Sequence, residues 1–132
     1  MSSVTALAFA LLFAAAPATA TSTSTAQPGI GRTDLSRNDL SDGREALQVL
    51  VAFGPGAAAA PHSHPGEELV YVVDGSIEYR IEGRPSVTLE GGDTLFIPTG
   101  AVHSARNVGS GRAAELATYI VAKGEPLVVS AR

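Results

Sequence analysis

Two stretches of the sequence decide the fold: GAAAAPHSHPGEELVYVVDG at residues 56–75 and GDTLFIPTGAVHSARN at residues 92–107. The chain has three histidines, and all of them fall in these stretches, as His62, His64 and His103. Glu68 is the carboxylate that accompanies them. Imidazole and carboxylate side chains gathered in this way are typical of a metal site.

The spacing of these residues suits strands that present them on one face. Side chains of an extended strand alternate between its faces, so His62 and His64 point the same way, about 7 Å apart along the strand. Glu68 opens an apolar run, in which period-two alternation puts it on one face with Val70 and Val72. A carboxylate at the head of an apolar face needs a partner.

His103 lies in a third short run, flanked on its own face by Ala101 and Ala105, which leave room beside the imidazole. Three imidazoles and one carboxylate suit a borderline divalent ion such as Fe, Mn, Ni, Cu or Zn, and they leave coordination positions open. The residue types therefore predict one divalent transition metal ion.

At these positions the sequence closely resembles the cupin superfamily, and within it the small, exported, single-domain bacterial members of the type-2 kind. The first family motif is glycine, five residues, His-x-His, three or four residues, glutamate, six residues and glycine. The second is glycine, five residues, Pro-x-Gly, two residues, histidine, three residues and asparagine. Every position is matched, by Gly56, His62, His64, Glu68 and Gly75 and then by Gly92, Pro98, Gly100, His103 and Asn107.

The resemblance implies an all-β fold, a single double-stranded β-helix barrel of the cupin or jelly-roll type. It also implies that the metal ligands are His62, His64, Glu68 and His103. A lone His-x-His pair is usually a surface or core feature, but fixed offsets that absorb every histidine of the chain are hard to obtain by chance. Glu67 is one residue short of the motif spacing, so we interpret it as a solvated charge at the rim.

The first 43 residues are expected to lie outside the barrel. Residues 1–20 join an apolar stretch to an Ala-x-Ala ending, which is typical of a secretory signal peptide cleaved after Ala20. The stretch is shorter than the ~18 residues that a membrane span needs. We therefore expect a periplasmic or secreted protein with no membrane segment in its mature form. Residues 21–43 are interpreted as a flexible leader and first turn, because their Thr/Ser-rich and Asp-Leu-Ser patterns favour disorder and turns.

Residues 44–123 alternate short apolar runs with turn signals at the spacing of a β-barrel. Asp74-Gly75 is a hairpin signal between the apolar runs at residues 69–73 and 77–81. No run predicts a helix, and residues 124–132 form a C-terminal tail. The chain carries 9 basic and 13 acidic residues, scattered along it, with a net charge of −4, which argues against a nucleic-acid partner.

The favoured function is that of an exported metal-binding cupin, a small metal-dependent enzyme of dioxygenase-like type acting on a small organic molecule. The alternatives are a non-catalytic protein that binds a metal or a small metabolite, and a Lewis-acid isomerase. No catalytic residue is assigned. Tyr79 is the one inward-facing candidate for an acid, and both Tyr79 and Phe96 are expected inside the barrel, chiefly as core residues.

Three further expectations concern the surface and the strand ends. Arg106 is expected on the strand face opposite His103, and Asn107 on the His103 face as a structural hydrogen-bonding residue. Cupins of this kind commonly form homodimers through edge strands, so residues 46–53 and 127–129 are the expected pairing segments.

Overall fold

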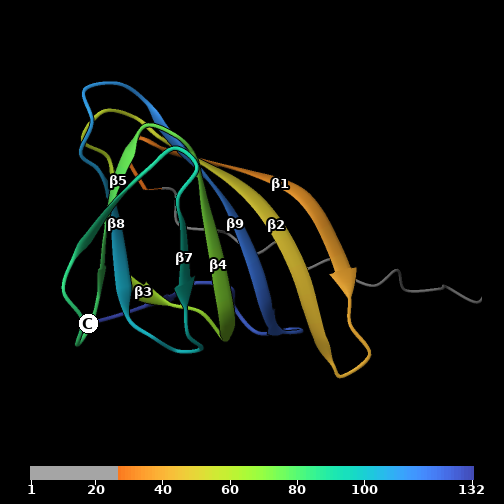
Figure 1. Cartoon of the computed structure of the whole chain (residues 1–132). Helices are drawn as coiled ribbons and strands as arrows, with labels where there is room; N and C mark the ends of the chain where they lie inside the picture. The colour runs from red at the N-terminus through yellow and green to blue at the C-terminus, as the bar shows by residue number, and fades with distance from the viewer. Residues whose placement is uncertain (1–26) are drawn as a thin grey trace, which may run out of the picture.

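The computed structural model describes residues 27–132, so the signal peptide expected at residues 1–20 and the start of the leader lie outside the described residues. The described chain forms ten strands joined by turns (Figure 1). None of its residues forms a helix long and apolar enough to cross a membrane. The strands are β1 (Ile30–Asp39), β2 (Arg44–Phe53), β3 (Ala58–Ser63), β4 (Gly66–Asp74), β5 (Ser76–Ile81), β6 (Val87–Glu90), β7 (Thr94–Ile97), β8 (His103–Asn107), β9 (Ala113–Ala122) and β10 (Val129–Ser130).

The strands make two five-stranded sheets that face each other. The first sheet has the order β1-β2-β9-β4-β7 and the second has the order β10-β3-β8-β5-β6. All the pairings within them are antiparallel. Because neighbours in a sheet are often far apart in the sequence, the chain crosses repeatedly between the two layers. The predicted all-β barrel of the jelly-roll type is confirmed.

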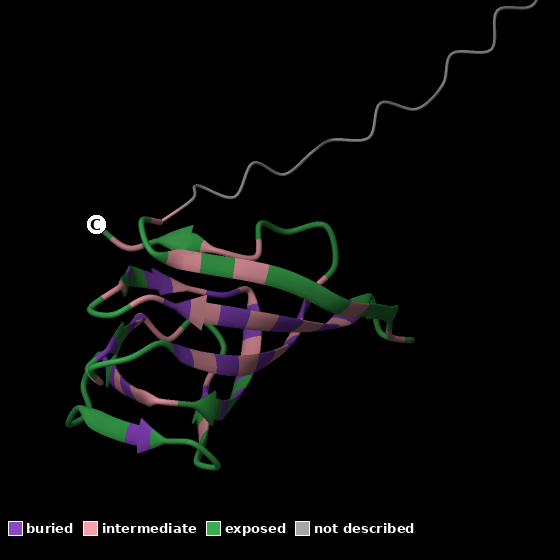
Figure 2. Ribbon diagram, turned by 90° about the horizontal axis from the view of Figure 1, so that it is seen from above, coloured by how far each residue is buried: buried purple, intermediate pink, exposed green. Residues whose placement is uncertain are grey.

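The core fills the space between the sheets. Along β2 every second residue is buried, from Leu47 to Phe53, and β9 repeats the pattern (Figure 2). Burying one such aliphatic or aromatic side chain contributes about 1.5–3 kcal/mol, so the two sheets are held together mainly by this layer. Asn107, as expected, is structural: its side-chain amide donates to the carbonyls of Phe53, Gly54 and Gly111, and its oxygen accepts from the amide of Gly109.

The flexible leader and first turn expected over residues 21–43 is wrong for residues 30–39, which form β1. This strand pairs with β2 from Ile30 opposite Phe53 to Asp39 opposite Glu45, with an irregularity between Asp34 and Ser36. Its Asp-Leu-Ser repeats are polar because β1 is an edge strand with mostly exposed residues. Hydrogen bonding to the apolar β2, and not apolar content of its own, makes this segment a strand.

Two expectations about edges also change. β2 lies between β1 and β9, so residues 46–53 have no free edge with which to pair a second chain. The C-terminal segment returns to the barrel, where β10 pairs with the end of β3 through Val129 opposite Ser63 and Ser130 opposite His62. The last residues of the chain therefore border the segment that carries two of the histidines.

Gly66, at the start of β4, is required by the close approach of β9. A Cβ atom at this position would lie 2.0 Å from the Ile120 carbonyl oxygen and 2.6 Å from the Val121 Cα. We therefore expect Gly66→Ala to lower the free energy of unfolding by about 3 kcal/mol, because overpacking of this kind forces the backbone to move. Urea denaturation measures the change. Gly31→Ala is the matched control, since a Cβ on this strand glycine meets nothing within 4 Å, and equal stability of the two variants would contradict the argument.

Candidate metal centre

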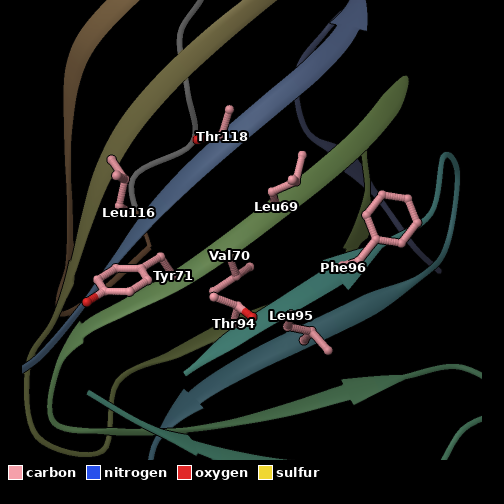
Figure 3. A pocket seen from close by; sticks show the side chains of 8 residues that line it. All are labelled: Leu69, Val70, Tyr71, Thr94, Leu95, Phe96, Leu116 and Thr118. Atoms are coloured by element: carbon pink, nitrogen blue, oxygen red, sulfur yellow. The ribbon is translucent and has the colours of Figure 1, made fainter. Parts of the chain in front are cut away.

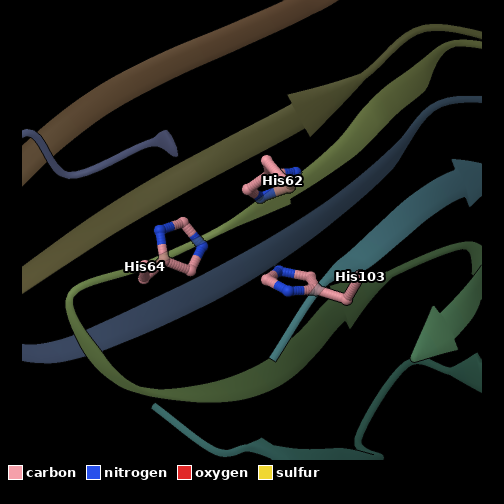
Figure 4. A group of neighbouring side chains, drawn as sticks. All are labelled: His62, His64 and His103. Atoms are coloured by element: carbon pink, nitrogen blue, oxygen red, sulfur yellow. The ribbon is translucent and has the colours of Figure 1, made fainter. Parts of the chain in front are cut away.

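The two sheets bring the four residues implied by the motifs together at one end of the barrel. His62 lies in β3 and His64 just beyond it, Glu68 lies in β4, and His103 is the first residue of β8. All four are buried, with exposures of 3–5%. The three imidazole rings turn toward a common centre (Figure 4), and each offers one ring nitrogen within 4.8 Å of those of the other two.

Backbone carbonyls fix the orientation of each ring. The Nδ1 atom of His62 donates to Ala60 O at 2.7 Å and that of His103 donates to Ala101 O at 2.9 Å. The Nδ1 atom of His64 donates to Leu127 O at 2.6 Å, in the segment before β10. A neutral imidazole has one N–H group, so these bonds place it on Nδ1 and leave the Nε2 lone pair free as a ligand atom.

Glu68 provides the fourth polar group of the centre. Its Oε2 atom lies 3.1 Å from His64 Nε2 and 3.0 Å from His103 Nε2. Both His64 Nε2 and Glu68 Oε2 are buried without a hydrogen-bond partner. Two electron-rich atoms that face each other in this way are costly unless a cation or a proton lies between them. The donor set therefore fits a divalent metal ion.

The protonation states also favour a metal ligand set. Burial lowers the pKa of His62 to about 4, which keeps this ring neutral. Burial alone would raise the pKa of Glu68, but the close approach of the His103 and His64 rings outweighs it and lowers that pKa to about 2. Burial likewise acts to lower the pKa of His103, yet the neighbouring Glu68 carboxylate raises it overall. At neutral pH His62 is thus a neutral ring and Glu68 an ionised carboxylate, as metal ligation requires.

The other residues considered from the sequence have mixed outcomes. Tyr79 is buried inside the barrel as expected, whereas Phe96 is 52% exposed on the outer face of β7, so its expected place in the interior is wrong. Arg106 is exposed, on the face opposite His103. Glu67 is half-buried at the surface, 3.7 Å from Arg44, which is consistent with a rim charge.

Sequence reasoning missed a second buried carboxyl group, that of Glu115 in β9. It is 5% exposed, and the Tyr79 hydroxyl, which comes from the opposite sheet, donates to its Oε2 atom. Burial, together with the charge of Glu68, raises the pKa of Glu115 to about 7. The signal was present in the sequence, because Glu115 occupies an inward position among the small and apolar residues of β9.

Two more side chains connect this carboxyl group with its surroundings. Arg32 in β1, Val51 in β2 and Glu115 in β9 occupy one cross-strand row, and Val51 is buried, so Arg32 shares the inner face. The positive charge of Arg32 acts to lower the pKa of Glu115. Tyr119, also in β9, packs its ring 4.7 Å from that of His64. The inner face of β9 therefore leads from the histidines to the buried carboxyl.

Comparison with known proteins places this geometry in context. Dimethylsulfoniopropionate lyase DddQ of Ruegeria pomeroyi is 35% identical over 63 residues, which are 47% of this chain and only 31% of that protein. Its crystal structure superimposes with a TM-score of 0.59 and 27% identity, covering 64% of this chain and 42% of that one.

Other solved structures cover more of the chain. KdgF from Halomonas sp. matches with a TM-score of 0.63 and 25% identity, over 74% of this chain and 84% of that chain. A recombinant oxalate oxidase in complex with glycolate matches with a TM-score of 0.65 and 26% identity, over 80% of this chain and 57% of that chain. The family model of the cupin domain matches residues 49–129. The motifs, the barrel and this match together establish that the chain belongs to the cupin family.

Proposed function

We propose that the protein is a metal-dependent enzyme that binds one divalent transition metal ion through His62, His64, Glu68 and His103 and acts on a small organic anion. One observation carries the proposal. The Nε2 atom of His64 and the Oε2 atom of Glu68 face each other at 3.1 Å, buried and without a hydrogen-bond donor. A shared cation relieves that arrangement, and three rings already oriented by carbonyls cost little to organise around it.

The charge of the centre supports an anionic substrate. Three neutral imidazoles and one carboxylate leave a divalent ion with a net charge of about +1, which attracts an anion into its open positions. The ion would supply Lewis acidity and, if it is Fe, Mn, Ni or Cu, dioxygenase-like redox chemistry. The names of two similar proteins, a dimethylsulfoniopropionate lyase and an oxalate oxidase in complex with glycolate, both refer to carboxylates. We therefore propose a small carboxylate as the substrate.

The pair of Tyr79 and Glu115 favours an enzyme over a passive binder. The Tyr79 hydroxyl donates to the Glu115 carboxyl inside the barrel, where both side chains are buried. A buried carboxyl with a pKa near 7 exchanges a proton readily at neutral pH. We propose that this pair holds a proton on the same inner face as the metal ligands, while Arg32 contributes positive charge to an anionic substrate.

The export of the protein is a separate proposal, which rests on the signal-like pattern of residues 1–20. Expression of the full chain in a bacterium with a periplasm should yield a periplasmic protein that begins at Thr21. Its mass should be that of residues 21–132. Intact-mass spectrometry of each cell fraction checks this. A full-length protein that stays in the cytoplasm would refute the export signal without affecting the metal site.

Loss of the central carboxylate should abolish metal binding. Glu68→Ala is expected to weaken the binding of Zn²⁺ or Mn²⁺ at least about 100-fold, because one of the four proposed ligands is lost and His64 Nε2 stays buried without a partner. The matched control is Glu67→Ala, which removes the neighbouring surface carboxylate and should bind as the wild type does. Competition with a chelating dye measures the dissociation constants, and elemental analysis gives the stoichiometry.

These measurements also test the proposed function. One ion per wild-type chain, lost in a His62→Ala/His103→Ala double variant, would support the site and justify a turnover screen with small carboxylates, glycolate and oxalate first. If the wild type binds the ion but turns over none of these carboxylates with any of the metals tested, the non-catalytic binder would be favoured. Equal metal content in the wild type and the double variant would refute the ligand set.

The buried carboxyl group should make stability depend on pH. The pKa of Glu115 is raised from 4.5 to about 7, so the folded chain keeps a proton that the unfolded chain releases. Between pH 4.5 and 7 the metal-free wild type should therefore lose up to roughly 3 kcal/mol of unfolding free energy relative to Glu115→Gln. Urea denaturation across this range measures the difference. Glu82→Gln, which changes an exposed carboxyl, should follow the wild type, and a flat difference for Glu115→Gln would contradict the argument.

A further inference from the structure

The four metal ligands are enclosed by the barrel. All of them are buried, so an ion can reach or leave them only when part of the surrounding chain moves. Two shallow hollows of about 310 and 220 Å³ lie on the outer faces of the two sheets, and no ligand lines either of them (Figure 3 shows the larger). Metal exchange therefore requires a movement of the chain next to the ligands.

Residues 124–132, which we call the strap, cross one end of the barrel. β9 belongs to the first sheet, and after a turn at Gly124 the chain passes to the second sheet, where β10 pairs with β3 (Figure 1, dark blue). The strap borders the stretch that carries His62 and His64. It is thus the part of the enclosure that lies directly beside two of the ligands.

Few contacts hold the strap in place. Its pairing with β3 covers only Val129 and Ser130. The backbone N–H of Ala131 donates to Pro61 O at 3.0 Å, and Leu127 packs partly buried against the core. By contrast, β4 and β8, which carry two of the ligands, are each paired with a strand on both sides. Segments with few buried contacts open locally at low free energy, so the strap can open while the barrel stays folded.

One hydrogen bond connects the strap to the ligands. The Leu127 carbonyl accepts from Nδ1 of His64 at 2.6 Å, across a separation of 63 residues in the sequence. The acceptors for His62 and His103 are carbonyls only two residues away in the same stretch of chain. These two rings therefore keep their orientation when the strap opens, whereas His64 loses its acceptor.

We propose that the Leu127 carbonyl is a positioning group for His64 and that the strap thereby controls metal exchange. Opening of the strap lets the His64 ring turn away from the other ligands, and docking of the strap returns it. The inference rests on the proposed metal site and not on the reaction. A ring that binds a cation through Nε2 keeps its proton on Nδ1 and donates it more strongly. Bound metal and docked strap therefore stabilise each other, equally in both directions.

Removal of the acceptor tests the positioning role. A variant that ends at Glu125 lacks Leu127, and it should bind Zn²⁺ about 10–100-fold more weakly, as expected when a metal-bound histidine loses its orienting partner. Competition with a chelating dye measures the dissociation constant. An affinity equal to that of the wild type would overturn the positioning role.

The histidine ring signals separate positioning from a general loss of structure. The chain has three histidines, so nitrogen-15 NMR at saturating Zn²⁺ shows at most three ring N–H signals. In the variant that ends at Glu125 the His64 signal should disappear through exchange with water, while those of His62 and His103 persist. Retention of all three signals would overturn the proposal, and so would the loss of all three from a folded barrel.

A milder variant tests the control of exchange without removing the carbonyl. Ala131→Pro loses the N–H that bonds to Pro61 O, and it should speed the release of Zn²⁺ into excess chelator about 5-fold, as expected from the loss of one hydrogen bond. Ala131→Ser keeps this N–H and is the matched control, with release at the wild-type rate. Stopped-flow absorbance measures the rates, and equal release from the two variants would overturn the control of exchange by the strap.

Amide hydrogen exchange identifies which segment moves. Zn²⁺ should slow the exchange of the Ala131 amide at least about 10-fold, because bound metal stabilises the docked strap. The loop between β7 and β8 also passes between the sheets, and its Gly100 amide donates to His64 O at 3.1 Å. Protection of Gly100 without protection of Ala131 would assign the movement to that loop and overturn the proposal. The Asp93 amide, which bonds within the turn before β7, is the control and should not change.

The same samples separate this proposal from the proposed function. A wild type that binds no Zn²⁺ would overturn the metal site and the strap together. A wild type that binds one Zn²⁺ ion, with unchanged exchange at Ala131 and unchanged affinity after truncation, would overturn the strap alone.

Discussion

The arrangement of this barrel depends on one buried carboxylate, that of Glu68, which faces imidazole nitrogens. An ionised carboxylate in a protein interior costs several kcal/mol unless it is paired. Its partners are His103 of β8, in the opposite sheet, and His64, just beyond the end of β3. The ring of His64 is held in turn by the carbonyl of Leu127 near the end of the chain. Gly66 allows β4, which carries Glu68, to lie close to β9. Both sheets and the C-terminal segment are therefore needed to satisfy a single group.

The barrel holds a second carboxyl group in the opposite protonation state. The close approach of the His103 and His64 rings keeps the pKa of Glu68 at about 2, whereas burial raises that of Glu115 to about 7. The two groups are coupled, because the negative charge of Glu68 contributes to the rise at Glu115. Two carboxyl groups whose surroundings separate their pKa values in this way are suited to different tasks, one as a permanent anion and the other as a proton carrier.

The sequence was sufficient to predict the barrel. It also predicted that His62, His64, Glu68 and His103 lie close together, because their spacing follows the period of a strand and the turns between strands. It did not reveal β1, whose polar residues form a strand only because β2 offers a hydrogen-bonding edge. It could not predict that the Leu127 carbonyl accepts a hydrogen bond from His64, since every residue has a backbone carbonyl and residue types do not distinguish this one. Phe96 was misplaced because an aromatic side chain suggests a core position, while the register of β7 with β4 turns it outward.

The edges of the two sheets offer little to the strand of a second chain. β1, the free edge on one side of the first sheet, carries charged residues along its length, which disfavour pairing with another strand. β7, on the other side, has only 4 residues. In the second sheet the outer strands β10 and β6 have 2 and 4 residues. A short or charged edge offers few backbone hydrogen bonds to a second chain. The described strands therefore disfavour the edge pairing that the sequence led us to expect.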